Sequence, residues 1–291
     1  MKNIIITSLL AFFVPFAVAC SLHKTDKPLA TTSVPPLSVQ LWSVKHAVKA
    51  DFKGTLQKIA DMGFKGVELA GDYGEFANDP AGLKAYLNSL GLTISGAHMG
   101  LKQLRGDKLQ KNIAFAKAAG IPMIIVPGDK RAAIGEEINS LTQELTELTN
   151  ILAKEGIAFG YHNHAKEFAA FNNSTYWDYI AQNTPKNMLL QLDVGWVNYA
   201  GVDPIDYLKR YPNRTLATHY KIRTKEGEKT SVILGQNNYD WSALLKATMQ
   251  YGGTQWIVIE QEEYPEDTSP LEAVAASKQG LDNIIAKLNS K

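Results

Sequence analysis

Cysteine is nearly absent from this chain, as are the features of several other protein classes. One cysteine in 291 residues allows no internal disulfide, so the stability of the fold must come from its core. The formal net charge is +1, and no basic run with interleaved aromatics occurs, which argues against a nucleic-acid partner. After the N-terminal segment, no apolar run approaches the ~20 residues of a membrane span. What is present is a hydrophobic fraction of 45%, enough for one large core.

The N-terminal segment is distinct from the rest of the chain. Lys2 precedes an apolar run that ends at Ala19, and this pattern predicts a secretory signal peptide over residues 1–19. Cys20 follows small residues, which resembles a bacterial lipoprotein signal in which Cys20 would be lipidated. An ordinary signal peptidase site near Ala19 is the alternative. Either way we expect an exported protein, at the periplasmic face or in the outer membrane, that meets the membrane only through a lipid anchor.

Residues 20–36 are rich in proline, serine, threonine and lysine, and they predict a flexible linker after the lipidated cysteine. From residue 37 to residue 291, eight short apolar runs alternate with segments of helical periodicity. Such repeats imply parallel strands joined by right-handed crossovers.

We therefore predict that residues 37–291 form a single-domain (β/α)8 TIM barrel. An open doubly wound sheet is the alternative, but no Gly-rich phosphate fingerprint follows the first strand. The predicted strands are 38–42, 65–69, 92–98, 123–126, 158–164, 188–193, 216–221 and 256–260, and the predicted helices are 52–62, 80–90, 113–119, 135–154, 175–183, 204–210, 240–250 and 270–288.

Ionisable side chains close most of these apolar runs. In a parallel barrel the strand C-termini meet at one rim, so these side chains should converge. Burying them together without a function would cost several kcal/mol of desolvation, which a divalent cation would offset. Four of them form a suitable nitrogen and oxygen ligand set: His162, Asp193, His219 and Glu260. The complete group adds Glu68 and His98 to these four.

Strand alternation places further groups on the same faces, because side chains two positions apart share a face. Lys221 should point inward with His219, where a cation suits a developing oxyanion, although a salt bridge at the barrel mouth is the alternative. His164 should accompany His162. Gln191 should lie behind Asp193 as a hydrogen-bond donor. The aromatic residues beyond strand ends suit a sugar-stacking wall or plain packing: Trp42, Trp196 and Tyr199.

Several motifs together resemble the xylose-isomerase-like TIM-barrel family over nearly all of residues 37–288. The family includes sugar (phosphate) isomerases and epimerases, inosose dehydratases, and lyases or hydratases of keto-sugars. The motifs are Val39-Gln40-Leu41-Trp42-Ser43-Val44, Gly66-Val67-Glu68, Gly160-Tyr161-His162-Asn163-His164, Gln191-Leu192-Asp193-Val194-Gly195-Trp196 and Val258-Ile259-Glu260-Gln261.

The resemblance implies metal ligands at the ends of strands five to eight, which here are His162, Asp193, His219 and Glu260. His162 stands where the epimerases have a Glu. Their mechanism, in which two glutamates exchange the proton at one substrate carbon from opposite faces, is therefore in doubt here. The family also often has His-x-Lys-Asp on strand seven, whereas Ile222 takes the place of that Asp here. Both departures favour a dehydratase or lyase over a strict epimerase.

We therefore expect a metal-dependent enzyme that removes a proton next to a carbonyl of a non-phosphorylated sugar or keto-sugar. The metal would be Mn, Mg, Co, Zn or Fe. The base would be Glu260 or Glu68, and the acid His98 or His164. Lys221 would hold the enediolate oxygen. The substrate contacts would include Trp42, Trp196 and Asn163.

Alternative functions remain within and outside this reaction class. Elimination of an aglycone or of water, as in a keto-glycoside lyase or hydratase or an inosose dehydratase, is the first. An apurinic endonuclease shares the fold but needs a basic surface that this composition lacks. A surface glycan-binding lipoprotein would keep the aromatic wall without the metal. The expected partner is a small carbohydrate, and a homodimer is compatible with the resemblance.

Overall fold

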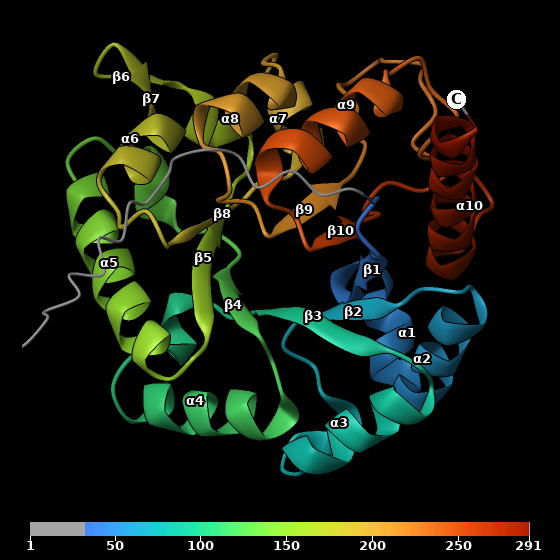
Figure 1. The fold of residues 1–291 in the computed structure, drawn as a ribbon, viewed down its shortest axis with the longest axis horizontal. Helices are drawn as coiled ribbons and strands as arrows, with labels where there is room; N and C mark the ends of the chain where they lie inside the picture. Colours follow the sequence, from blue (N-terminus) through green and yellow to red (C-terminus); the bar gives the residue numbers. More distant parts are fainter. Residues whose placement is uncertain (1–32, 291) are drawn as a thin grey trace, which may run out of the picture.

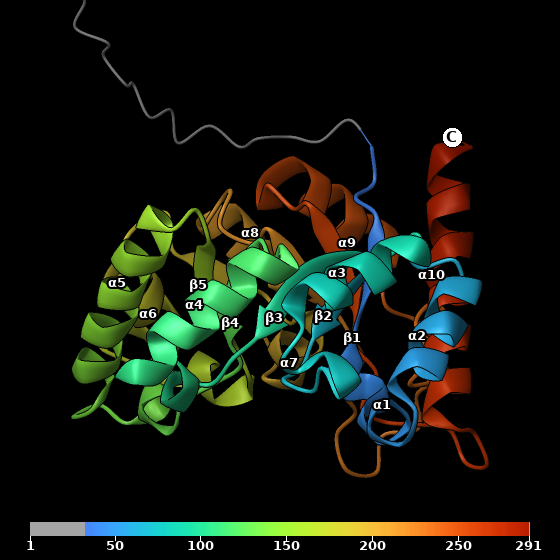
Figure 2. The same ribbon diagram turned by 90° about the horizontal axis from the view of Figure 1, so that it is seen from below.

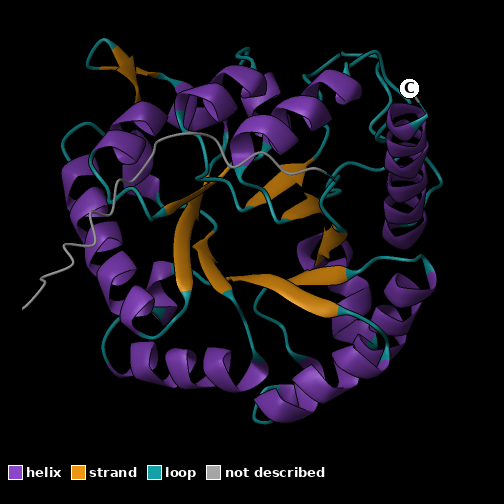
Figure 3. Ribbon diagram, in the orientation of Figure 1, coloured by secondary structure: helices purple, strands orange, loops and turns teal. Residues whose placement is uncertain are grey.

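Eight parallel strands surround one axis in the computed structural model, which describes residues 33–290 (Figures 1 and 3). β1 pairs with both β2 and β10, and the order continues around the sheet to β8 and β9. The strands are β1 (Leu37–Gln40), β2 (Gly66–Leu69), β3 (Thr93–His98), β4 (Met123–Val126), β5 (Ala158–His162), β8 (Leu189–Gln191), β9 (Ala217–Tyr220) and β10 (Trp256–Ile259).

The two ends of this sheet, β8 and β9, meet through a single parallel bridge between Asp193 and His219. The His219 amide donates to the Leu192 carbonyl oxygen at 2.9 Å, and the Leu190 amide donates to the Arg214 carbonyl oxygen at 2.6 Å. The structure is therefore a nearly closed barrel of eight parallel strands, which excludes the open doubly wound sheet.

Helices cover the outside of the barrel, and Figure 2 shows α10 standing beside α2, where it completes the outer ring. Aspartate side chains cap several helices by accepting a backbone N–H of the first turn, as Asp51 does for α2 and Asp240 does for α9. The helices are α1 (Lys45–Ala50), α2 (Phe52–Asp61), α3 (Pro80–Ser89), α4 (Asp107–Ala119), α5 (Ile138–Lys154), α6 (Tyr176–Gln182), α7 (Val194–Tyr199), α8 (Pro204–Arg210), α9 (Trp241–Ala247) and α10 (Pro270–Asn289).

The predicted alternation is confirmed, but five strands end one or two residues earlier than predicted. These strands and their last residues are β1 at Gln40, β5 at His162, β8 at Gln191, β9 at Tyr220 and β10 at Ile259. The sequence also did not predict the short helices α1 and α7 or the small hairpin β6 (Ala170–Phe171) and β7 (Ser174–Thr175). Helix α7 forms because Asp193, taken as the last strand residue, instead caps it through Oδ1, which accepts the Trp196 amide at 3.0 Å.

The expected signal peptide, Cys20 and most of the linker lie outside the described residues. Among the helices that the structure describes, none combines the length and apolarity that crossing a bilayer would require.

Candidate metal centre and active site

Four of the predicted side chains converge where the strands end. One ligand atom from each residue of this cluster lies within 4.8 Å of the ligand atoms of the other three. The rim of the barrel brings them together from positions spread over about a third of the chain. The cluster consists of His162 at the end of β5, Asp193 after β8, His219 in β9 and Glu260 after β10.

The atoms of this metal cluster are arranged around Asp193 Oδ2. His162 Nε2 lies 3.7 Å from that oxygen and His219 Nδ1 lies 4.0 Å from it, while His219 Nδ1 lies 3.1 Å from Glu260 Oε2. Asp193 Oδ2 is buried and accepts no hydrogen bond. A buried carboxylate oxygen is costly without a partner. Two imidazoles and two carboxylates around such an atom fit a divalent cation.

Glu68 contacts the His219 ring at the nitrogen that faces away from the other ligands. Its Oε2 lies 2.6 Å from His219 Nε2, which leaves Nδ1 of that ring facing Asp193 and Glu260. Gln40 Nε2 donates to the same carboxylate at 2.7 Å. A carboxylate on the far nitrogen fixes the ring orientation of a metal-binding histidine and raises its basicity.

Gln191 performs the same task for His162, because its Oε1 lies 3.0 Å from Nδ1 of that ring. Its Nε2 donates to Glu68 Oε1 at 2.7 Å, so the two orienting residues are themselves connected. Gln191 was expected to donate to Asp193. It instead reaches away from Asp193, because β8 ends at Gln191 and the chain turns into α7.

Glu68, one of the two predicted bases, lies outside the lining of the pocket above the cluster. Its side chain is fully buried, and both of its oxygens accept hydrogen bonds. Although burial raises the pKa of Glu68, the neighbouring His219 and His98 hold it well below its ordinary value. Glu68 is therefore placed to orient imidazoles.

Lys221 lies inside the cluster, as strand alternation with His219 predicted. Its Nζ is 3.1 Å from Glu260 Oε2 and 3.5 Å from Asp193 Oδ2, and it also bonds to Glu262. Burial lowers the pKa of Lys221, but the carboxylates of Glu260 and Asp193 raise it overall, so the ammonium group stays charged. Sequence reasoning missed Glu262, although its position two residues after Glu260 gave the same alternation signal.

The histidines and the aspartate of the metal cluster have pKa values far from their ordinary ones. Burial lowers the pKa of His219, but Glu68 and Glu260 outweigh it and raise that pKa to about 10. Burial raises the pKa of Asp193 to about 6, against the lowering effect of Lys221. The pKa of His162 falls well below its ordinary value because of burial and the neighbouring His219. A cation would therefore displace a proton from His219.

A pocket of about 460 Å³ opens above the metal cluster, and both predicted acid residues line it. His98 Nε2 lies 2.7 Å from Gln191 Oε1 and 3.1 Å from Glu68 Oε2, so this nitrogen faces two oxygens that can accept a hydrogen bond. Burial and then Lys221 lower the pKa of His164 to about 4, so that ring is neutral at pH 7.

The three predicted substrate contacts have different positions. Trp42 lines the pocket mouth, is 45% exposed, and donates from Nε1 to Glu262 Oε1 at 3.2 Å. The Trp196 ring lies 5.3 Å from the His164 ring, beside the pocket. Asn163 is fully buried, and its amide exchanges two hydrogen bonds with the backbone of Asp193. Asn163 therefore fixes the position of Asp193 and has no access to the pocket.

Comparison with known proteins matches residues 56–286 to the Xylose isomerase-like TIM barrel family. An inosose dehydratase from Clostridium botulinum is 24% identical over 266 residues, which cover 78% of this chain and 88% of that protein. A sugar phosphate isomerase/epimerase structure from Parabacteroides distasonis aligns with a TM-score of 0.71 and 21% identity, over 85% of this chain and 98% of that one. IOLI, solved with a bound zinc atom, aligns with a TM-score of 0.63 and 18% identity, over 88% and 100%.

Proposed function

Because this chain belongs to the Xylose isomerase-like TIM barrel family, we propose that it is a divalent-metal-dependent enzyme acting on a carbohydrate. The observation that carries this proposal is the buried metal cluster, in which Asp193 Oδ2 accepts no hydrogen bond. His162, Asp193, His219 and Glu260 would hold the ion. The family also includes proteins named for sugar isomerisation and for dehydration, and the IOLI structure contains zinc. The ion would be Mn, Mg, Co, Zn or Fe.

The proposed reaction is removal of a proton next to a carbonyl of a sugar or keto-sugar. The bound ion would supply Lewis acidity to the substrate oxygens and so acidify that proton. Glu260 lines the pocket and would be the base, since Glu68 does not line it. His98, which also lines the pocket, would be the acid. Lys221 would hold the oxygen on which negative charge develops, because its ammonium group already lies among the ligand carboxylates.

The proposed substrate carries no phosphate group. Among the described residues that line the pocket, Lys221 is the only cation, and Glu260 and Glu262 already pair with it. A phosphate dianion would need more donors than this lining offers.

Elimination is the second candidate outcome of the same proton abstraction. It is favoured by His162, which stands where the epimerases of the family have a Glu, and by the inosose dehydratases among the relatives. His164, neutral and on the pocket wall, would then direct the departing oxygen by a hydrogen bond.

One experiment tests the chemistry and separates its two outcomes. The metal-loaded protein is incubated in deuterated water with free ketoses, glycosides and 3-keto-glycosides. Deuterium incorporation locates the labile carbon, and product analysis distinguishes isomerisation or epimerisation from elimination.

His219→Ala should abolish both stoichiometric metal binding and deuterium incorporation, because it removes one of the four ligands of the cluster. His46→Ala is the matched control, since His46 is an exposed imidazole on α1 outside the cluster. Full turnover by His219→Ala after chelation and dialysis would rule the metal mechanism out. A wild-type protein without stoichiometric metal would favour a glycan-binding protein instead.

Export and lipidation remain part of this proposal, supported by the N-terminal sequence. Cys20→Ser should move the protein from the membrane fraction to the soluble fraction of its host. An unchanged membrane association would reject the lipid anchor.

A further inference from the structure

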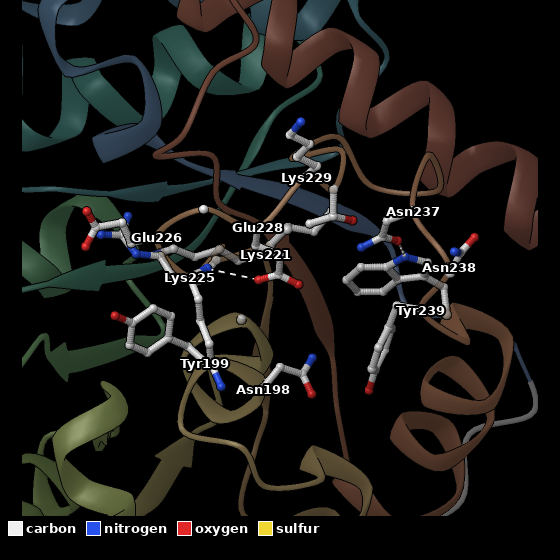
Figure 4. Close-up of a pocket in the computed structure, with 16 residues that line it drawn as sticks. Asn198, Tyr199, Lys221, Lys225, Glu226, Glu228, Lys229, Asn237, Asn238 and Tyr239 are labelled. Carbon is white, nitrogen blue, oxygen red and sulfur yellow. Dashed lines mark hydrogen bonds between the residues drawn. The ribbon is translucent and has the colours of Figure 1, made fainter.

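A second hollow lies beside the metal pocket, under the connection between β9 and α9. It has a volume of about 830 Å³, larger than the pocket above the cluster, and Lys221 lines both cavities. Figure 4 shows Asn198, Tyr199 and Tyr239 along one edge of this hollow, with Glu226 and Glu228 of the loop across from them. Nothing in the proposed reaction uses these residues.

The loop that covers the hollow is long but fixed. Residues 221–240 contain no helix or strand, whereas loops beyond about 12–15 residues are uncommon and usually serve binding or catalysis. Arg223 pairs with Glu263 at 3.0 Å near the start of the loop. The Leu234 amide donates to Ser277 Oγ at 3.2 Å, and Gly280 packs directly against the Leu234 carbonyl. The loop is therefore anchored near its start and near its middle, on either side of the exposed residues 225–229 that line the hollow.

Trp196 forms the ridge between the two cavities. Its ring lies 5.3 Å from the ring of His164, which lines the metal pocket. It also lies 5.5 Å from the ring of Tyr199 and 4.5 Å from the guanidinium of Arg223, which both line the hollow. One molecule that crosses Trp196 would therefore place one part at the metal cluster and another part in the hollow.

The charges of the hollow cancel, which indicates what kind of ligand it takes. Its buried or half-buried cations, Lys221 and Arg223, are paired with carboxylates of the segment after β10. The exposed part of the loop adds two cations and two anions: Lys225, Glu226, Glu228 and Lys229.

Most of the remaining lining side chains are amides and aromatic rings. Asn198 and Tyr239 both line the hollow, Trp241 Nε1 donates to Asn237 Oδ1 at 2.8 Å, and Tyr199 is 37% exposed. Amides that give and accept hydrogen bonds, next to aromatic faces, suit a neutral ring with several hydroxyl groups.

We propose that this hollow is a second carbohydrate subsite, so that the enzyme takes a neutral two-ring sugar whose reacting ring lies at the metal cluster. The second ring would rest beyond Trp196, between Tyr199 and the amides of Asn198 and Asn238. This inference rests on the proposed function in one respect, the statement of which ring of the sugar reacts. The binding of the second ring does not depend on the metal.

The test measures sugar binding without catalysis. The full chain, treated with a chelator, is titrated with glucose, maltose, cellobiose and trehalose by ligand-observed NMR. At least one disaccharide should bind more tightly than glucose. Tyr199→Ala should weaken that disaccharide about five- to tenfold, as expected for loss of an aromatic contact, and leave glucose unchanged. Asn238→Ala should act in the same direction.

Asn88→Ala is the matched control, because Asn88 is an exposed amide on α3 away from both cavities. Equal affinity for glucose and for every disaccharide, or unchanged disaccharide binding in Tyr199→Ala, would overturn the subsite. These outcomes are separate from the proposed chemistry. If the protein bound no metal and was inactive but preferred disaccharides, the subsite would stand and the metal mechanism would fail. If the protein was active but showed no such preference, the mechanism would stand and the subsite would fail.

Discussion

Replacing Glu68 with Gln tests whether a buried carboxylate sets the geometry of the metal cluster. The substitution keeps the shape of the side chain but removes its charge and turns one acceptor oxygen into a donor. Four side-chain nitrogens face that carboxylate: His219 Nε2 at 2.6 Å, Gln40 Nε2 at 2.7 Å, Gln191 Nε2 at 2.7 Å and His98 Nε2 at 3.1 Å. At least one of them would meet an N–H group in Glu68→Gln.

Two magnitudes follow from these contacts. Removing the charge of one partner in a buried charged network costs about 3–5 kcal/mol. The free energy of unfolding of the metal-free protein should therefore fall by about 3 kcal/mol. Loss of an outer partner of a metal-binding histidine lowers metal affinity about 10- to 100-fold. Both losses should occur together in Glu68→Gln, because the same carboxylate balances the buried His219 and orients its ring.

The assay combines chemical denaturation with competition between protein and chelator for the metal. Glu167→Gln is the matched control. Glu167 is also fully buried near the site, where it accepts from the Tyr161 hydroxyl and the His164 amide, but it does not touch His219. Glu167→Gln should lose stability while keeping metal affinity. If Glu68→Gln folded normally and bound metal with wild-type affinity, the orienting role of Glu68 would be refuted.

Two further predictions concern pH. Metal binding must displace protons from His219, whose pKa is raised to about 10, and below pH 6 also from Asp193, whose pKa is raised to about 6. Affinity should therefore rise about tenfold per pH unit between pH 6 and 10 and more steeply below 6; a pH-independent affinity in chelator competition would contradict these proton counts. Asp178 accepts from Ser174, Thr175, Arg210 and Tyr211, and although burial raises the pKa of Asp178, these hydrogen bonds lower it overall. Its contribution should be present above the unfolded pKa of about 4 and vanish as the pH falls through the lower folded value. Asp178→Asn should thus cost about 2 kcal/mol at pH 7 and little at pH 2, measured by urea unfolding, and equal costs at both values would contradict the assignment.

The barrel could be predicted from the sequence because its signals are local. Apolar runs of strand length, helical periodicity and capping residues such as Asp51 and Asp240 each act within a few positions of chain. The convergence of the candidate ligands was predictable for a related reason. A polar residue that ends an apolar run must lie near the rim of a parallel barrel, so His162, His219 and Glu260 could be grouped without coordinates.

The boundaries and the supporting contacts could not be predicted in this way. Asp193 was assigned to a strand, yet it caps α7 with one oxygen and offers the other to the metal cluster. Asn163 has the position of a pocket residue but turns into the wall to hold the Asp193 backbone. Each of these outcomes depends on where a strand stops, which packing against neighbours decides.

By itself, the sequence determined the alternation of strands and helices and the chemical identity of the groups at the strand ends, since both are written in neighbouring residues. Only the tertiary structure decided that Glu68 meets His219, 151 positions away, and that Glu68 does not line the pocket. It also decided that residues 221–240 enclose a second hollow beside the first. The physical reason is that burial and hydrogen-bond partners depend on barrel closure and loop packing, which join distant segments at distances that no local pattern encodes.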